Sequence, residues 1–476
     1  MAETHQDSGG DRPQTPVLAP GHTYATVTAT IADVVLKRPL DWRWAIGMGI
    51  GTSLLIIFTG AVANLLYMGT GIWGINAPVM WGWAIINFVW WVGIGHAGTL
   101  ISAILLLLKQ QWRTSINRFA EAMTLFAVAC AGLFPLLHMG RPWKFFWMMP
   151  YPSTLGLLPQ WRSPLVWDVF AVSTYATVSA LFWYVGLLPD LATLRDRAKN
   201  KYVAMIYGSL ALGWRGSARH WSRYKSAYML LAALATPLVV SVHTVVSLDF
   251  AASVIPGWHA TIFPPYFVAG AIFSGFAMVV TLCVPLRSWY GLKDFITDRH
   301  LDNMAKIMLA TGMVVGYGYA TELFIAWYSN NPYEEFLLLN ARPFGTYSNA
   351  WRFMFFCNVG IPQLLWFPAI RRNAGLLWVI SIFVNIGMWL ERYVIVITSL
   401  SQDFLPSSWA DYSATKWDVA TYVGTIGLFT FLIFLFVRVL PAIAISEMRE
   451  LVHETSHEHG AHGDGRVAVE AHGENR

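Results

Sequence analysis

The segment AIGMGIGTSLLIIFTGAVANLLYM, residues 45–68, contains no Asp, Glu, Lys or Arg. About 20 mostly apolar residues are enough for one helix to cross a bilayer. Nine further stretches qualify, at about 79–108, 119–139, 163–188, 226–250, 265–290, 303–328, 349–370, 375–400 and 417–440. The sequence therefore predicts an all-α integral membrane protein with about ten transmembrane helices.

The composition excludes a soluble protein. Hydrophobic residues make up 56% of the chain and charged residues 12%, whereas soluble domains carry roughly 25% charged residues. The 24 tryptophans suit the aromatic belts found at membrane interfaces. Cys130, Cys283 and Cys357 lie singly in apolar stretches. An iron–sulfur cluster needs several thiolates close together, so we interpret these cysteines as small core residues.

The loops predict the orientation, because Lys and Arg gather in cytoplasmic loops. Sixteen of these residues lie in one set of loops, and the opposite set has only Arg141, Lys144, Arg162, Arg342 and Lys416. We therefore expect both termini in the cytoplasm of a bacterium, with the protein in its cytoplasmic membrane. The loops near residues 69–78 and 251–264 are then periplasmic.

A faint internal repeat predicts the domain organisation. Trp167-Asp168 and Trp351-Arg352 each open a helix that follows a loop with an Arg-Pro pair. Two tandem four-helix bundles, flanked by one peripheral helix at each end, follow from this repeat. The expected units are a polar arm (1–44), the first peripheral helix and its outer loop (45–78), the first bundle (79–250), the second bundle (251–400), the last peripheral helix (401–440) and a polar, His-rich tail (441–476).

Ionisable side chains inside a membrane are costly and are functional candidates by default. Three consecutive helices bring five of them to the same outer depth: His138, Arg141, Asp168, His243 and Asp249. Quinol oxidation needs a base near each of two hydroxyl groups, and a histidine paired with a carboxylate can serve. Apolar side chains nearby could hold the tail of a quinol: Phe134, Trp147, Trp167 and Phe170. The alternative is that these polar groups only hydrogen-bond helix ends and interfacial water.

The helical register limits this grouping. His243 and Asp249 are six residues apart, so they point to different faces of a regular helix. Both reach one pocket only if the helix bends or ends before Asp249. One haem between His138 and His243 is a competing interpretation, but no repeated histidine pair favours it.

Further charged groups fall in the predicted spans. His96 lies near the middle of the membrane, with Glu322, Glu391 and Arg392 in the second bundle. Neighbours in a helix point about 100° apart, so we expect Glu391 and Arg392 to pair across helices, for instance with Arg352 and Glu322, rather than with each other. These groups are either structural ion pairs or a proton path.

Several segments together resemble a known family. They are Pro135-Leu136-Leu137-His138-Met139-Gly140-Arg141-Pro142, Trp167-Asp168, His243 and Glu391-Arg392-Tyr393. Over roughly residues 45–440 the chain resembles the NrfD/polysulfide reductase membrane subunits. It is most similar to the larger such subunit of alternative complex III.

The resemblance implies a function. Such a subunit binds menaquinol or another quinol at the periplasmic end of the first bundle and holds no metal or haem itself. Its electrons pass to a periplasmic iron–sulfur subunit, beside multihaem cytochrome c subunits and a second NrfD-like membrane subunit. The family's site falls on His138, Asp168 and Asp249, with His243 close by. A proton path through the second bundle is implied less strongly, because Arg352 stands where the first bundle has Asp168.

Two other classes of function stay open from the residues. A secondary transporter also uses repeats and buried polar groups, although its site usually lies at the midplane. A purely structural anchor for a periplasmic redox arm would not need His138 or Asp168. Lipid is an expected partner and nucleic acid is not. The outer loops 138–162 and 251–264 are rich in aromatic residues, including Trp143 and Trp258, which predicts a docking surface for the redox subunit.

Overall fold

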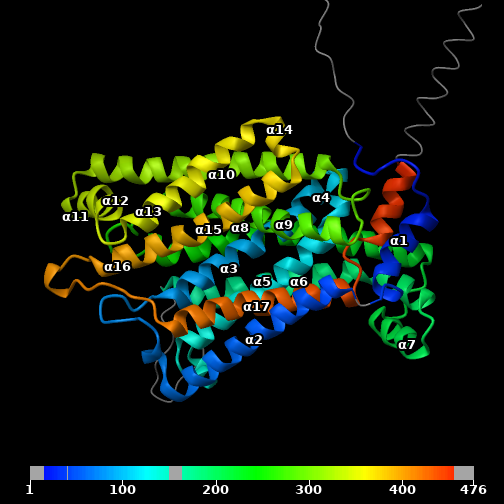
Figure 1. The fold of residues 1–476 in the computed structure, drawn as a ribbon, viewed down its shortest axis with the longest axis horizontal. Coiled ribbons are helices and arrows are strands. Elements are labelled where there is room, and N and C mark those ends of the chain that lie inside the picture. Colours follow the sequence, from blue (N-terminus) through cyan, green and yellow to red (C-terminus); the bar gives the residue numbers. More distant parts are fainter. Residues whose placement is uncertain (1–15, 40, 149–162, 455–476) are drawn as a thin grey trace, which may run out of the picture.

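The computed structural model describes residues 16–39, 41–148 and 163–454. Over these ranges nine helices are long and apolar enough to cross a membrane, and no strand occurs. They run side by side along the long axis of the molecule (Figure 1). The nine are α2 (Trp42–Met68), α3 continuing through α4 (Trp83–Leu107), α5 (Asn117–His138), α6 (Pro164–Arg197), α8 (Ala218–Ala251), α9 (Phe263–Trp289), α10 (Asp298–Ser329), α15 continuing through α16 (Ala374–Ser401) and α17 (Lys416–Val439). The predicted all-α membrane fold is confirmed.

The eighth predicted span, 349–370, is helical over most of its length, but it is not one regular α-helix. It consists of α13 (Ser348–Phe355), a wide π-type turn (Phe356–Gly360), a tight 3-10 segment (Ile361–Trp366) and α14 (Pro368–Arg371). Pro362 has no N–H to donate, and its ring clashes with a carbonyl one turn earlier in a regular α-helix. The wide turn directly before Pro362 changes the spacing of the backbone. The span is therefore interrupted near its middle.

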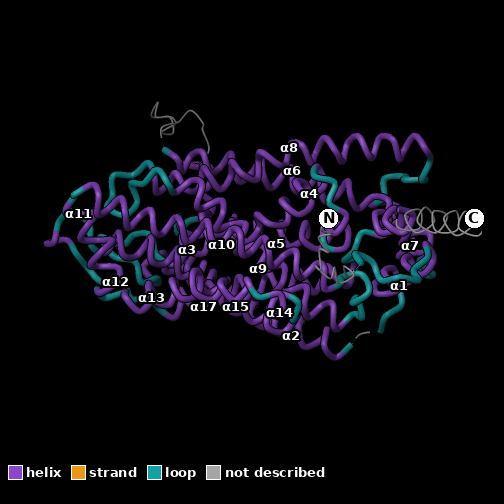
Figure 2. Tube along the Cα trace, turned by 90° about the horizontal axis from the view of Figure 1, so that it is seen from above, coloured by secondary structure: helices purple, strands orange, loops and turns teal. Residues whose placement is uncertain are grey.

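The long helices form two groups that share a central contact. In the first group α3 packs on α5 and α8, and α6 packs on α8. In the second group α9 packs on α10 and α15. The contacts of α9 with α3 and α8 join the two groups. Figure 2 shows α6 and α8 along one edge of the molecule, with α2 along the opposite edge.

Helices α2 and α17 pack against each other, although they come from opposite ends of the chain. Their backbones approach so closely that a Cβ on Gly427 would lie 2.3 Å from the Cβ of Leu54. Small residues allow such close contacts between helices in membranes, where van der Waals packing replaces the hydrophobic effect. The two flanking helices are therefore one packed pair.

The two ends of the bundle differ. We call the end where α6 begins and α8 ends the site face, and the opposite end the basic face. The short helices α11 (Pro332–Glu335) and α12 (Arg342–Phe344) lie at the site face, whereas α1 (Tyr24–Leu36) and α7 (Lys201–Leu210) lie at the basic face (Figure 1). A last helix, residues 445–454, also covers the basic face.

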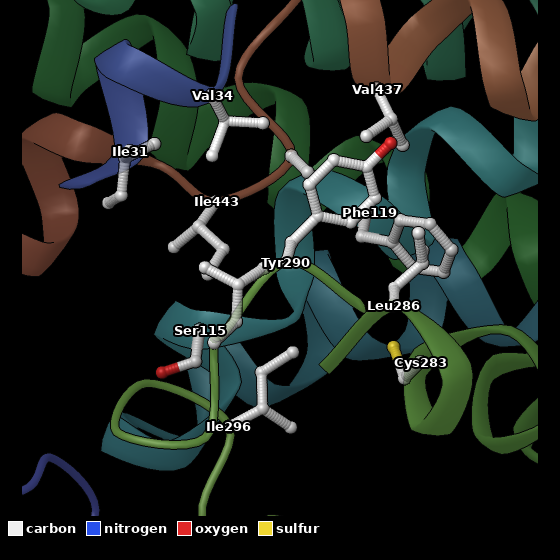
Figure 3. Close-up of a pocket in the computed structure, with 12 residues that line it drawn as sticks. Ile31, Val34, Ser115, Phe119, Cys283, Leu286, Tyr290, Ile296, Val437 and Ile443 are labelled. Carbon is white, nitrogen blue, oxygen red and sulfur yellow. The ribbon is translucent and has the colours of Figure 1, made fainter. Parts of the chain in front are cut away.

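A small apolar cavity lies beneath α1 at the basic face. Figure 3 shows side chains from α1, α5 and α9 around it, among them Ile31, Phe119 and Leu286. Its volume is about 20 Å³, which is room for about one water-sized sphere. Cys283 lines it, and Cys130 and Cys357 are buried elsewhere as free thiols. This cavity is too small for an organic ligand.

Candidate functional site

Two aspartates face each other at the site face. Asp168 lies just over one turn into α6, and Asp249 lies in the last turn of α8. The two helices pack side by side, and Pro164 in the first turn of α6 has its φ angle preset for a helix. The carboxyl groups of Asp168 and Asp249 are hydrogen-bonded to each other.

The carboxyl pair keeps free acceptors. The Oδ1 atoms of Asp168 and Asp249 are both buried, and neither has a hydrogen-bond partner among the described residues. A hydrogen bond between two carboxyl groups requires a proton on one of them, because ionised carboxylates only accept. The pair can therefore bind a hydroxyl donor and hold a proton at the same time.

His138 is near this end but contacts a different group. It is the last residue of α5, and its ring stacks on Trp73, with ring centroids 6.4 Å apart and planes 11° from parallel. Its Nδ1 has no hydrogen-bond partner within the described ranges. Gly140 follows with φ +69°, a left-handed conformation that glycine adopts without strain. Arg141 after this turn is exposed.

His243 lies deeper than the two aspartates. It is six residues before Asp249 on α8, which is about 9 Å along a helix. Its ring packs against His96 of α3, with centroids 5.3 Å apart, and both histidines are fully buried. None of their four ring nitrogens has a partner among the described residues. His243 therefore contacts His96 and not the aspartates. This agrees with the six-residue spacing, which points His243 and Asp249 to different faces of a regular helix.

The apolar residues predicted to hold the quinol tail lie partly in the core and partly on the surface. Phe134 is fully buried, whereas Trp167 and Phe170 are 37% and 43% exposed on α6 beside Asp168. The side chain of Trp147 and the segment 149–162 lie outside the described residues. Trp167 and Phe170 thus offer an apolar approach to Asp168 from the lipid side of α6.

The predicted docking surface needs a correction. Trp143 and Phe145 are exposed at the site face, at 58% and 48%. Trp258 is only 3% exposed, because it packs on Phe250 and donates its indole N–H to the carbonyl of Ile395 at 2.7 Å. The prediction that Trp258 belongs to an exposed aromatic patch is therefore wrong.

A second polar group occupies the second bundle. Glu391 and Arg392 lie against each other as an ion pair, so the expectation that they do not pair is wrong. Tyr319 donates a hydrogen bond to Glu391, and Asn358 of the interrupted span donates one to the Tyr319 hydroxyl at 2.8 Å. The Arg392 guanidinium lies over the ring of Phe267, 4.9 Å from its centroid. The wide π-type turn at 356–360 brings Asn358 to this cluster.

Glu322 has a different partner from the one predicted. Arg342 Nη1 lies 3.9 Å from Glu322 Oε2, and Arg342 also donates to the Gly257 carbonyl at 3.2 Å. Arg352 is exposed and donates to the Pro343 carbonyl, so the prediction that it pairs with a buried glutamate is wrong. Arg342-Pro343 is the counterpart of Arg141-Pro142 in the sequence, and this repeat is the signal that could have identified Arg342.

A third polar group, at the basic face, was missed from the sequence. Arg118 is fully buried and contacts Glu121 at 3.4 Å and Asp190 at 3.3 Å. Tyr228 donates to Glu121, and Asp190 accepts the backbone N–H groups of Ile445 and Ser446. This network attaches the C-terminal helix to the first bundle. The orientation rule counted Arg118 as a loop cation, although α5 begins at Asn117.

The chain is similar to known proteins over most of its length. The sequence profile described as "Polysulphide reductase, NrfD" matches residues 73–402. A putative membrane subunit of dimethyl sulfoxide reductase from Halobacterium salinarum is 25% identical over 429 residues, which are 83% of this chain and 90% of the relative. A subunit of selenate reductase from Mesobacillus selenatarsenatis is 21% identical over 395 residues, 79% and 88% of the two chains. The profile spans both helix groups, including the Asp168–Asp249 pair, and the chain therefore belongs to the NrfD polysulphide reductase family.

Proposed function

We propose that this chain is the quinol-binding membrane subunit of a multi-subunit oxidoreductase. The observation that carries the proposal is the hydrogen-bonded pair of Asp168 and Asp249, with two buried oxygen atoms free of protein partners among the described residues. Buried carboxyl groups in a membrane protein are rare and mark proton or substrate sites. Membership of the NrfD family agrees with this chemistry.

The pair suits the proton chemistry of a quinol. Oxidation of one quinol to a quinone releases two protons and two electrons. One hydroxyl donates to a free Oδ1 atom of the pair and transfers its proton there, as in general base catalysis. His138, at the same end, is the candidate acceptor for the other proton. The electrons leave to an iron–sulfur acceptor in a partner subunit, which the family resemblance implies.

The names of the relatives support a direction of electron flow. Both are named as subunits of reductases, and a reductase consumes electrons. Quinol is then the donor, as it is in the quinol-oxidising complexes that the sequence resembles. The two relatives serve reductases of different acceptors, dimethyl sulfoxide and selenate. We infer that partner subunits, and not this chain, set the final acceptor.

The charge distribution supports a periplasmic location for the pair. The site face is the face with few Lys and Arg residues, and the basic face carries α7 and its cationic flanks. Because cytoplasmic loops collect such residues, we place the site face in the periplasm and both termini in the cytoplasm.

A second component of the proposal is a proton relay in the second bundle. A cavity of about 20 Å³ is lined by Tyr266, Glu322, Arg342 and Glu391, which is room for about one water. Oε1 of Glu322 and the Tyr266 hydroxyl both lack a hydrogen-bond partner in the described structure, whereas Glu391 lies against Arg392 and accepts from Tyr319. One water there can bridge the two glutamates. Phe267 contacts both Arg392 and His243, and His243 in turn contacts His96.

The relay has its own test. Glu391→Gln removes the titratable group but keeps an acceptor for Tyr319. We expect fewer protons released per electron from proteoliposomes holding the intact complex, while quinol oxidation by uncoupled membranes stays near normal. An unchanged proton-to-electron ratio in this variant would exclude Glu391 from the relay.

The quinol site is tested by binding. A quinol-analogue inhibitor should bind the detergent-extracted complex with an affinity that falls at least about tenfold in Asp168→Asn, because a charge-assisted hydrogen bond is replaced by a neutral one. Asp411→Asn is the matched control, since Asp411 is an exposed aspartate in the loop before α17 at the same face. Equal affinities in the two variants would contradict the site.

A further inference from the structure

A cleft of about 500 Å³ opens at the basic face, between the end of α6, the start of α8 and the C-terminal helix. Four cations line it, against two acids, Asp196 and Glu450. The cations are Arg195, Arg215, Lys225 and Arg449. Two indole rings, Trp214 and Trp221, complete the wall. The cleft therefore carries a surplus of positive charge beside aromatic side chains.

Both acids already have partners. Arg195 Nε lies 2.8 Å from Asp196, and Lys225 Nζ lies 2.7 Å from Glu450. Arg449 donates through Nε to the Thr28 hydroxyl of α1. Arg215 makes no ion pair and no side-chain hydrogen bond with the rest of the described chain. The surplus charge is thus carried by Arg215 and Arg449, which remain available to an anion.

An apolar groove adjoins the basic cleft. It has a volume of about 270 Å³ and shares Trp214 with the cleft. Its wall includes Val185 and Leu188 of α6 and Leu212 of the turn after α7, with His220 and Arg223 of α8 at its edge. A free inorganic anion would make no apolar contact with this groove. An acyl chain attached to a phosphate would pack against its wall.

Helix α7 shows where this region lies relative to a bilayer. Its large apolar residues are exposed on one side at helical spacing: Tyr202, Met205, Ile206 and Leu210. Lys199 and Lys201 precede these residues. A helix with exposed apolar residues and basic flanks lies in the membrane interface, at the level of the headgroups. Figure 1 shows α7 outside the main bundle at this end, so the cleft sits at headgroup depth.

We infer that the cleft and groove form a binding site for one anionic phospholipid. Its phosphate lies between Arg215 and Arg449, and one acyl chain enters the groove along Leu212. Basic pockets between transmembrane helices on the cytoplasmic side recognise anionic headgroups in this way. The site is separate from the carboxyl pair, which lies at the opposite end of α6 and α8.

The test uses native mass spectrometry of the intact, delipidated complex titrated with phosphatidylglycerol. Arg215→Gln should weaken binding about fivefold, the effect of removing one cation near an anionic headgroup. Lys293→Gln is the matched control, because Lys293 is an exposed cation in the α9–α10 loop at the same face. Phosphatidylcholine should bind more weakly than phosphatidylglycerol in the unaltered complex. Equal binding of the two lipids, or equal losses in the two variants, would overturn the site.

Two further arms separate a lipid from a free anion. Leu212→Glu places a charge at the groove and should weaken phosphatidylglycerol binding at least as much as Arg215→Gln does. Inorganic phosphate at millimolar concentration should not displace the bound lipid. Displacement by phosphate, with unchanged binding in Leu212→Glu, would assign the cleft to a soluble anion and contradict the lipid proposal.

Discussion

Asp168 and Asp249 are the residues whose burial most needs an explanation. An ionised carboxylate loses a large hydration energy inside a membrane protein. One hydrogen bond joins these two carboxyl groups, but one oxygen atom of each stays without a described partner. A purely structural pair would satisfy those oxygens. The free acceptors instead fit a site that binds a hydroxyl donor.

Replacing Asp168 separates catalysis from assembly. Asp168→Asn keeps the size and a hydrogen bond to Asp249 but removes the base. We expect quinol oxidation by the assembled complex to fall about 10²–10⁴-fold, the usual contribution of a positioned acid or base. Steady-state turnover in membranes, with subunit content measured in parallel, is the readout. Near-normal turnover with normal assembly would rule out a role for Asp168 as a base.

The sequence predicted the two aspartates because the start of α6 and the end of α8 fall on the same face of the bundle. The predictions that were wrong concern residues whose partners lie on other helices. His243 shares a helix with Asp249, but its depth and its direction bring it to His96. Arg342 was assigned to a loop, and only the contact of α12 with α10 reveals its distance of 3.9 Å to Glu322. Spacing along one helix does not determine which neighbouring helix a side chain meets.

At the scale of elements, the pair formed by α2 and α17 depends on glycine. A side chain at Gly427 would collide with Leu54, since even its Cβ would lie 2.3 Å away, whereas a Cβ added to Gly60 on α2 would have no heavy atom within 4 Å. Gly427→Val should therefore lower the free energy of unfolding by about 1–3 kcal/mol, the typical cost of overpacking. Gly60→Val, the matched control, should change it by less than about 1 kcal/mol.

Thermal unfolding of the purified complex in detergent is the measurement for this pair of variants. A midpoint lowered only by Gly427→Val supports the close packing of α2 on α17. Equal midpoints for Gly427→Val and Gly60→Val would show that the two helices are not in this contact.

Nine of the ten predicted spans are continuous helices within the described residues, because length and apolar composition are enough to specify a span. The exception, 349–370, is also apolar over most of its length. Its interruption depends on Pro362 and on the bond from Asn358 to Tyr319. Two other features could not be predicted from the sequence: the end of α6 at Arg197 and the contact of residues 445–454 with Asp190. Both depend on a buried ion-pair network.

For the whole molecule, the two faces have different roles. The site face holds the carboxyl pair and the exposed aromatic residues Trp143 and Phe145, and the basic face holds the cleft that we propose for an anionic lipid. This polarity matches a subunit that exchanges electrons on one side of a membrane and is anchored by anionic lipid on the other. The interrupted span resembles those of transporters, but NrfD membership favours the redox function.

The polarity itself can be tested. Alkaline phosphatase fused within residues 74–80 should be active, because that loop is expected in the periplasm. A fusion within residues 198–200, beside the basic cluster, should be inactive and a green fluorescent protein fusion there should fluoresce. The reverse pattern would place the carboxyl pair on the cytoplasmic side.

The most direct test of the central claim is where a quinone binds. A photoreactive quinone analogue, activated on the intact complex in native membranes, should label peptides of this chain that hold Asp168 on α6 or Asp249 on α8. Excess quinol should suppress that label, and peptide mass spectrometry locates it. Specific labelling confined to other subunits, or to the second bundle of this chain, would contradict the assignment of the quinol site to the Asp168–Asp249 pair.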